Sequence, residues 1–285
     1  MSEDSSVILL TADLGFGAFD IFERFRNKQY FNVGVSEQLM ASMAAGFASE
    51  GFSVFIYSIG VFPTMRCLEQ IRNDISYHDL SVTIVSSGAG FSYGALGMTH
   101  HCVQDIGIMR SIPGINIFTP ANNTEMNDIL DIEKEIKYIR IDKSELDLKP
   151  IIVSPSYEYY CYYTNNNLPN YSKILVLSHG SIASIVLPLL NNKYKFDLYT
   201  IPHLNETKQL LNLCKEYNRI ITIEEHSEVN GFFNFISSIL SKYNINKNIS
   251  FMALPHHHSS VVGDQSYLRD FYGLTSSKLK EKLMS

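Results

Sequence analysis

The sequence predicts an α/β protein made of two doubly wound domains, each built on a parallel sheet. Two observations indicate this class. Short, almost continuously apolar runs alternate with segments of helical periodicity, which is typical of parallel strands buried on both faces. The alternation also starts again near residue 174. With 285 residues and 45% hydrophobic content, the chain is long enough for two domains that each have a core.

In the first half, strands and helices alternate from the beginning of the chain. The expected strands are residues 7–13, 31–35, 53–59, 81–87, 115–120 and 137–142. The expected helices are residues 18–27, 36–50, 64–77, 102–111 and 123–135. We assign residues 1–165 to this domain. The Asn- and Tyr-rich stretch 157–173 is typical of a linker at its end.

The second half repeats the alternation and is assigned residues 171–285. The expected strands are residues 174–180, 196–201, 219–225 and 249–255, and the expected helices are residues 182–191, 205–217, 231–243 and 275–283. In both halves, conspicuous polar residues follow the carboxyl ends of strands. Open parallel sheets bind their ligands at that edge.

Composition excludes several classes of function. The net charge is −6 and no block of Lys and Arg occurs, so nucleic acid is a poor partner. No apolar run is long enough for a membrane helix, and the first residues lack the basic stretch of a signal peptide. The 4 cysteines are scattered without a CxxC pair, which predicts reduced thiols and a cytoplasmic protein.

One acidic residue stands in an unusual context, the stretch FNVGVSEQLMASMAAGFASEG at residues 31–51. Glu37 falls in the first turn of a predicted helix, where a carboxylate stabilises the helix dipole and Ser36 is a suitable N-cap. Alternatively, Glu37 is a carboxyl group in an apolar pocket that shares a proton with a ligand nitrogen. The pattern leaves both interpretations open. The small residues that follow would allow a partner helix to approach closely.

A glycine-rich segment, residues 88–97, is followed by two histidines. Such a loop can bind phosphate through its backbone N–H groups, but its spacing is not that of a P-loop or a dinucleotide motif. His100 and His101 are either catalytic residues of a polar pocket or partly buried structural residues. Together with Cys102 they are a poor metal site, because adjacent side chains point in different directions.

Three further features have a structural and a functional interpretation. Arg140, near the end of an apolar strand, is either salt-bridged at the core edge or an anion clamp. His256, His257 and His258 form a run in which at most two side chains share a face, and two ligands do not make a metal site. A solvated loop is the alternative. The mixed charges of residues 66–74 indicate a half-exposed or interface helix.

Four motifs occur in the order known from one enzyme family. They are TADLG (residues 11–15), GVSEQLMASMAAGFASEG (34–51), GMTHHCVQDIGIMRSIPGINIFTPANNTE (97–125) and ITIEEHSEVNGF (221–232). They resemble the transketolase family of thiamine diphosphate enzymes, and the likeness extends from Val7 to about residue 280. The resemblance implies a pyrimidine-binding domain followed by a transketolase C-terminal domain.

The resemblance covers only the C-terminal half of a complete transketolase. The family's diphosphate-binding domain, which carries a GDG…N motif and holds Mg²⁺, has no counterpart in this sequence. The resemblance therefore implies the C-terminal (beta) subunit of a split transketolase, which transfers a two-carbon ketol unit between sugars. A separate thiamine diphosphate-binding subunit would hold the magnesium ion and complete an α2β2 heterotetramer. This chain is expected to hold no metal.

The resemblance also implies roles for individual residues. Glu37 would be catalytic and hydrogen-bond the aminopyrimidine ring of thiamine diphosphate, and His100 would be a second catalytic residue that contacts substrate. The other cofactor-binding residues implied are Asp13, Tyr57, Ile59 and Phe62. His101 and Arg140 are implied to join His100 in binding the sugar substrate.

Some positions depart from the family pattern. Leu96 stands where the family has an Asp, Gly88 where it has a His, and Gly17 where it has a Ser. A different sugar, nucleotide-linked or otherwise modified, is one explanation. The alternatives with the same cofactor are the beta subunit of a 2-oxo acid dehydrogenase and a pyruvate-dependent synthase similar to deoxyxylulose phosphate synthase. A non-catalytic interaction subunit is an alternative of a different class.

Overall fold

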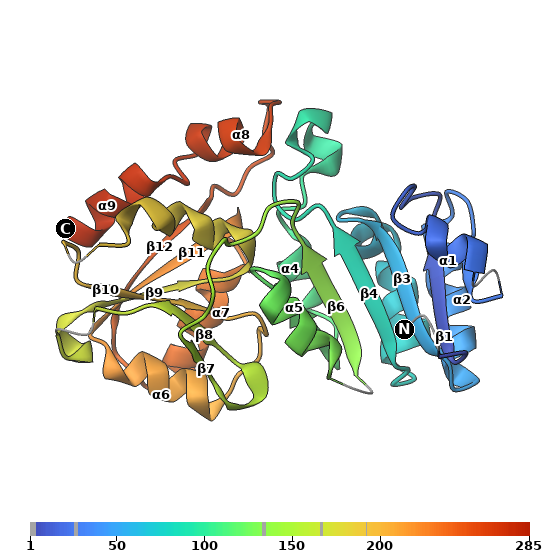
Figure 1. The fold of residues 1–285 in the computed structure, drawn as a ribbon, viewed down its shortest axis with the longest axis horizontal. Coiled ribbons are helices and arrows are strands. Elements are labelled where there is room, and N and C mark those ends of the chain that lie inside the picture. Colours follow the sequence, from blue (N-terminus) through green and yellow to red (C-terminus); the bar gives the residue numbers. More distant parts are fainter. Residues whose placement is uncertain (1–3, 26–27, 133–134, 166–167, 192) are drawn as a thin grey trace.

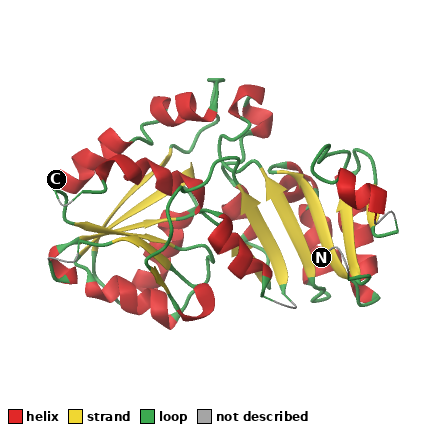
Figure 2. Ribbon diagram, viewed as in Figure 1, coloured by secondary structure: helices red, strands yellow, loops and turns green. Residues whose placement is uncertain are grey.

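The computed structural model describes residues 4–25, 28–132, 135–165, 168–191 and 193–285. Two α/β units lie side by side, the first on the right of Figure 1 and the second on the left. Each unit is built on a six-stranded sheet with helices packed against its faces (Figure 2). The predicted fold class, two domains with mainly parallel sheets, is confirmed.

The first sheet has the strand order β2-β1-β3-β4-β6-β5, and all of its pairs are parallel. Its strands are β1 (Val7–Thr11), β2 (Tyr30–Asn32), β3 (Ser53–Ile59), β4 (Val82–Ser87), β5 (Ile115–Phe118) and β6 (Ile136–Ile141). Crossover connections place helices on both faces, which is why these strands are nearly continuous in apolar residues.

The helices of the first domain begin close to the positions expected. They are α1 (Asp20–Phe25), α2 (Glu37–Ser49), η1 (Phe62–Arg66), α3 (Leu68–Gln70), η2 (Ile71–Ser76), η3 (Gly94–Leu96), η4 (Met98–His100), α4 (Asp105–Met109) and α5 (Asn123–Leu130). For α5 the cause is local, because the Asn122 side chain accepts hydrogen bonds from the backbone N–H groups of Thr124 and Glu125.

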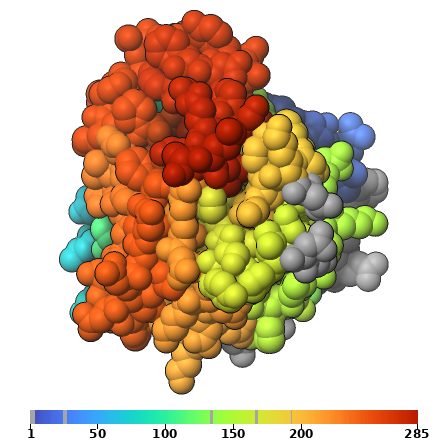
Figure 3. Space-filling view, turned by 90° about the vertical axis from the view of Figure 1, so that its left-hand side faces the viewer, coloured from blue at the N-terminus to red at the C-terminus, as the bar shows by residue number. Residues whose placement is uncertain are grey.

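The second sheet has the order β12-β11-β9-β10-β8-β7. Its strands are β7 (Ile152–Val153), β8 (Tyr160–Tyr163), β9 (Ile174–Ser178), β10 (Phe196–Thr200), β11 (Arg219–Ser227) and β12 (Asn248–Leu254). The helices are η5 (Pro155–Tyr157), η6 (Asn170–Ser172), η7 (Gly180–Leu189), α6 (Lys208–Glu216), α7 (Phe232–Lys242), α8 (Gln265–Phe271) and α9 (Ser276–Met284). The sequence pattern did not predict α8. Figure 3 shows α9, in dark red, on the outer face of this domain beside η7.

The interpretation of residues 157–173 as a linker is wrong for β8. This strand pairs antiparallel with β10 and with β7, so residues 152–163 form a hairpin at the edge of the second sheet. Tyr160, Cys161 and Tyr162 are buried there. The first sheet ends at Ile141, and the boundary predicted at residue 165 falls after two strands of the second sheet. A Tyr-rich strand between Asn-rich segments gave no clear alternation to mark it.

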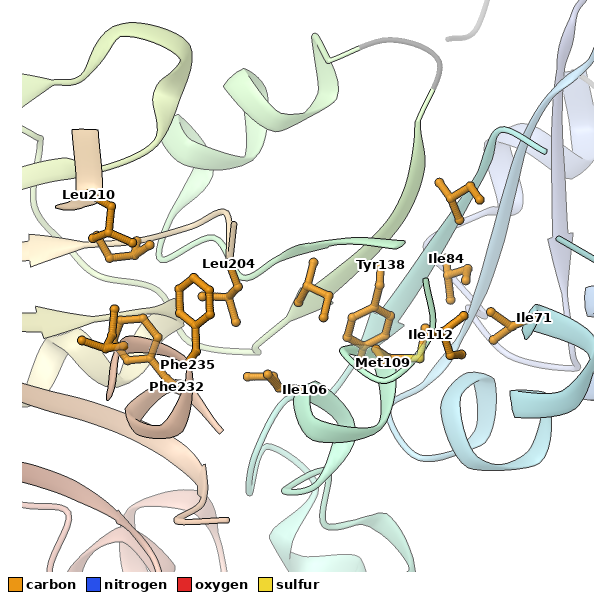
Figure 4. Close-up of a cluster of buried hydrophobic side chains, with 14 of the residues drawn as sticks. Ile71, Ile84, Ile106, Met109, Ile112, Tyr138, Leu204, Leu210, Phe232 and Phe235 are labelled. Carbon is orange, nitrogen blue, oxygen red and sulfur yellow. The ribbon is translucent and has the colours of Figure 1, made fainter. Parts of the chain in front are cut away.

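The largest apolar cluster continues from one domain into the other. Figure 4 shows residues of the first domain, including Ile84 and Tyr138, in line with Leu204, Phe232 and Phe235 of the second. Ile106 lies between the two groups. The two sheets therefore share a core at their junction. No helix within the described ranges is long and apolar enough to cross a membrane.

A polar cluster also joins the domains. Glu225 of β11 accepts a hydrogen bond from the backbone N–H of Phe91 (2.7 Å) and one from Arg269 Nε (2.6 Å). Arg269 Nη2 also lies 3.4 Å from Asp142 Oδ2. Because Glu225 is almost fully buried, these donors replace the water that its carboxylate loses on folding. The cluster holds α8 against both sheets.

Candidate active site

Glu37 begins α2, directly after β2 and a Gly-containing turn. The residue is only 5% exposed although its neighbours Val35 and Leu39 are 71% and 53% exposed. Ser36 occupies the N-cap position, but its side chain makes no capping hydrogen bond. The expected cap is therefore wrong in its contact. Glu37 is the residue of this helix start that is turned inward.

The partner of Glu37 is Arg66, at the end of η1. Arg66 Nη1 lies 2.8 Å from Glu37 Oε1, and the Arg66 side chain is half exposed. The other carboxylate oxygen, Oε2, has no hydrogen-bond partner among the residues that the structure describes. The surroundings of Glu37 are thus not purely apolar, as the sequence suggested. A guanidinium holds one oxygen and leaves the other open.

A surface pocket of about 480 Å³ opens over this ion pair. Its lining combines the Glu37 and Arg66 side chains with the exposed apolar side chains of Val35 and Leu39. A buried carboxylate beside an apolar rim suits a ligand that has a flat, weakly polar ring and a nitrogen that can bond to the acid.

Phe62 and His100 continue the site away from Glu37. The Arg66 guanidinium carbon lies 4.2 Å from the centroid of the Phe62 ring. The edge of the His100 ring meets Phe62, with centroids 5.3 Å apart. His100 Nδ1 is 3.0 Å from Thr99 Oγ1. The structure therefore brings together three predicted residues, Glu37, Phe62 and His100, and adds Arg66 between them.

Asp13, Tyr57 and Ile59 lie at the same edge of the sheet but are less closely joined to this group. Asp13 has a left-handed backbone with φ of 56°, and its N–H donates to Asn32 Oδ1 over 2.9 Å. Tyr57 and Ile59 are half-buried on the same face of β3. None of the three makes a described hydrogen bond or ion pair with Glu37. Their position at the carboxyl ends of β1 and β3 keeps them beside the site.

Arg140 does not have the exposure that a substrate contact needs. It is 4% exposed, and its Nε lies 2.7 Å from Asp105 Oδ2. Its Nη2 donates to the carbonyl oxygens of Cys102 (2.9 Å) and Glu225 (3.1 Å). Burial opposes the charge, but Asp105 and its neighbours raise the pKa of Arg140 above its usual value. The structure supports the salt-bridged interpretation, because the guanidinium is used up inside the domain junction.

His101 is separated from His100 in space although it is adjacent in sequence. It is 4% exposed, its Nε2 lies 3.2 Å from the Gly94 carbonyl oxygen, and its ring meets Phe91 edge-on. Burial lowers the pKa of His101 and favours its neutral form. His101 faces a cavity between the domains. The expected pairing of His100 and His101 at one substrate is therefore not seen.

His256, His257 and His258 are exposed, as expected for a loop, but they line that same interdomain cavity. Within the described ranges, no group of three His, Cys, Asp or Glu residues is placed to hold a metal ion.

Sequence reasoning missed Arg66 as a site residue. It was visible only as one charge in the helix at residues 66–74. Its role depends on reaching a residue 29 positions earlier, and no local periodicity encodes such a contact.

Comparison with known proteins agrees with this arrangement. Residues 1–147 match the family model of the transketolase pyrimidine binding domain. One of the two subunits of the apulose-4-phosphate transketolase of Actinobacillus succinogenes is 26% identical over 263 residues, which cover 89% of this chain and 83% of that protein. A putative transketolase C-terminal section of Methanocaldococcus jannaschii is 25% identical and covers 98% of this chain and 90% of its own length.

Longer relatives are matched over about half their length. The 1-deoxy-D-xylulose-5-phosphate synthase of Dictyoglomus turgidum is 28% identical over 98% of this chain but only 46% of that protein. Among solved structures, one described as a split gene transketolase, inactive beta4 tetramer, has a TM-score of 0.81 at 22% identity. It covers 99% of this chain and 92% of its own. With the family model matching more than half of the sequence, this chain belongs to the transketolase family.

Proposed function

We propose that this chain is the C-terminal (beta) subunit of a split transketolase, active together with a separate thiamine diphosphate-binding subunit. The proposal is supported by two relatives, one described as a transketolase subunit and one as a transketolase C-terminal section, each covered over most of its length. The reaction is the transfer of a two-carbon ketol unit between sugars, either sugar phosphates or modified sugars.

The residues present fit the aminopyrimidine half of thiamine diphosphate. Glu37 offers a sheltered carboxylate oxygen without a described protein partner, and Phe62 offers an aromatic wall next to it. Tyr57 and Ile59 extend the apolar surface along β3. When bound, the cofactor supplies the carbanion chemistry that side chains cannot perform.

The chain's own residues then have distinct tasks. Glu37 holds a proton at the ring nitrogen of the aminopyrimidine, which needs a carboxyl sheltered from bulk water. His100, on the other side of Phe62, is placed to contact a substrate hydroxyl. Arg66 competes with the ligand for Glu37 Oε1 and keeps that carboxylate ionised while the pocket is empty of ligand.

The pocket needs a second polypeptide to close it. Val35, Leu39 and Met65 stand at its rim with large exposed fractions, and apolar surface of this kind is typical of a protein interface. We propose that the partner covers this rim and holds Mg²⁺ and the diphosphate, in an α2β2 assembly. A cytosolic location stays a prediction.

The observation that carries the proposal is the inward-facing carboxylate of Glu37 with one open oxygen. The test is Glu37→Gln, assayed with the partner subunit and a ketose donor. We expect turnover to fall by about 10²- to 10⁴-fold, because the amide cannot exchange the proton, while size-exclusion chromatography still shows the assembly. Glu50→Gln, at the exposed end of the same helix, is the matched control. Unchanged turnover in Glu37→Gln would refute the assignment.

A pyruvate-dependent synthase is the second candidate, favoured by the deoxyxylulose phosphate synthase relatives that align with almost the whole chain. Donor preference separates the two. The reconstituted pair should consume a ketose faster than pyruvate if the transketolase proposal is right, and the reverse order would establish the synthase.

A further inference from the structure

A second cavity, of about 530 Å³, lies between the two domains. The first domain contributes Phe62, Phe91 and Met98 to its wall, and the second contributes Leu254, Tyr272 and the histidine run 256–258. Its volume is within the range of small-molecule sites, which commonly lie between domains. It is not the Glu37 pocket, although Arg66 lines both.

The charges around this cavity are all of one kind. None of the described lining residues is an Asp or a Glu, while one Arg and four His belong to the lining. This is unusual in a chain of net charge −6. His101 stays neutral because burial lowers its pKa, so Arg66 and the three loop histidines are the possible cations.

The other walls are aromatic and apolar. Phe91 and Tyr272 are stacked with ring centroids 5.6 Å apart, and the His257 ring lies 6.0 Å from Tyr272. His256 is oriented by Ser227, whose Oγ is 3.2 Å from His256 Nδ1. The imidazoles thus stand at the edge of an apolar chamber, where each Nε2 lacks a described hydrogen-bond partner.

From this arrangement we propose that the interdomain cavity binds a small organic anion, a carboxylate or phosphate carried on an apolar or aromatic body. The anionic group pairs with Arg66 and the histidine loop, and the body lies against Phe91 and Tyr272. Binding favours the protonated, doubly donating form of the imidazoles. This site is independent of the proposed transketolase reaction.

Arg66 links the cavity to Glu37. Its guanidinium has one described charged partner, the Glu37 carboxylate at 2.8 Å, and it lies over Phe62, which also lines the cavity. An anion in the cavity therefore competes with Glu37 for Arg66. Occupation of the cavity releases the Glu37 carboxylate to a ligand in its own pocket, so the two sites are coupled.

The binding test uses the purified full chain without cofactor or partner, so its failure is distinguishable from failure of the proposed function. Isothermal titration calorimetry compares benzoate, phenyl phosphate, the neutral benzamide and inorganic phosphate. We expect one or both aromatic anions to bind at least about tenfold more tightly than benzamide and than inorganic phosphate. Preference for benzoate or for phenyl phosphate identifies the anionic group.

The double variant His256→Ala/His258→Ala should weaken the preferred probe about tenfold, whereas His78→Ala, an exposed histidine outside the cavity, should leave it unchanged. Circular dichroism checks that the loop variant is folded. Equal binding of benzamide, no binding of any probe, or an unchanged affinity in the loop variant would each overturn the proposal.

The coupling has its own signature. Glu37→Gln removes the competing carboxylate without touching the cavity, so it should tighten the aromatic anion by about three- to tenfold. Arg66→Met should weaken the anion and abolish the gain from Glu37→Gln. A Glu37→Gln affinity equal to that of the unchanged protein would show that Arg66 does not connect the sites.

Discussion

Two ion pairs of this protein have the same chemistry and opposite surroundings. Glu37–Arg66 lies at the rim of a pocket, with the arginine half exposed. Asp105–Arg140 lies at the domain junction, where the side chains are 0% and 4% exposed. The sequence made Glu37 and Arg140 equal candidates for the site. The structure separates them.

The difference lies in what each charge has left to offer. Arg140 is shared among Asp105, the Cys102 carbonyl and the Glu225 carbonyl, and Tyr138 donates to the same Asp105 oxygen. In the pocket, one oxygen of Glu37 is open and Arg66 can turn toward solvent. A satisfied buried pair holds the fold together, and an incompletely satisfied pair at a cavity is available for a ligand.

The largest contrast is expected when each arginine is removed. Arg140→Met leaves Asp105 buried without its cation and should lower the free energy of unfolding by about 3–5 kcal/mol. Arg66→Met should lower it by less than about 1 kcal/mol, because its pair is partly solvated. Urea unfolding followed by circular dichroism measures both. Similar losses in the two variants would break the comparison.

The buried pair should also give the protein an acid-sensitive stability. His226 faces Asp105 and Glu224, with contacts of 4.0 and 3.8 Å, and lies near Arg140. Burial lowers the pKa of His226 to about 4. Between pH 6.5 and 4 the unfolded chain therefore binds more protons at this residue than the native chain, so stability is lost as the pH falls.

The variant His226→Gln isolates this contribution. Between about pH 7 and pH 4 its free energy of unfolding should fall by up to about 3 kcal/mol less than that of the unchanged protein. Urea titrations at several pH values measure the difference. Parallel pH profiles for the two proteins would show that His226 does not titrate as its surroundings suggest.

An intermediate loss is expected at the second junction cluster. Arg269→Met removes a cation from the buried Glu225, which keeps its bond from the Phe91 N–H. The free energy of unfolding should fall by about 1–3 kcal/mol. Lys242→Met, in an exposed pair with Glu206, serves as the control and should change stability too little to measure. A loss as small in Arg269→Met would mean that α8 is held by apolar contacts alone.

The smallest effect should come from the contact between Phe62 and Arg66. A double-mutant cycle with Phe62→Leu and Arg66→Met should give a coupling free energy of about 0.5–1 kcal/mol, as expected for a cation over an aromatic face near solvent. Thermal or urea unfolding of the four proteins measures it. Additive losses would show that the ring and the guanidinium are neighbours without a favourable interaction.

The sequence by itself determined the fold class and the position of Glu37. Alternating apolar strands and helices predicted both sheets, since such periodicity reflects burial within each element. Side-chain caps such as Asn122 predicted a helix start within a residue. Glu37 was found because a strand end followed by a helix start is a local pattern. The edge hairpin at residues 152–163 was missed because its partner strand, β10, lies further along the chain.

Only the tertiary structure decided which charges serve the site. Arg66 reaches Glu37 across 29 positions, and Arg140 reaches Asp105 across 35. The same fold moves His101 into the domain junction and brings the histidine run to the opposite wall of one cavity. Contacts over such separations depend on how the sheets pack together, and a local pattern of residue types carries no record of that packing.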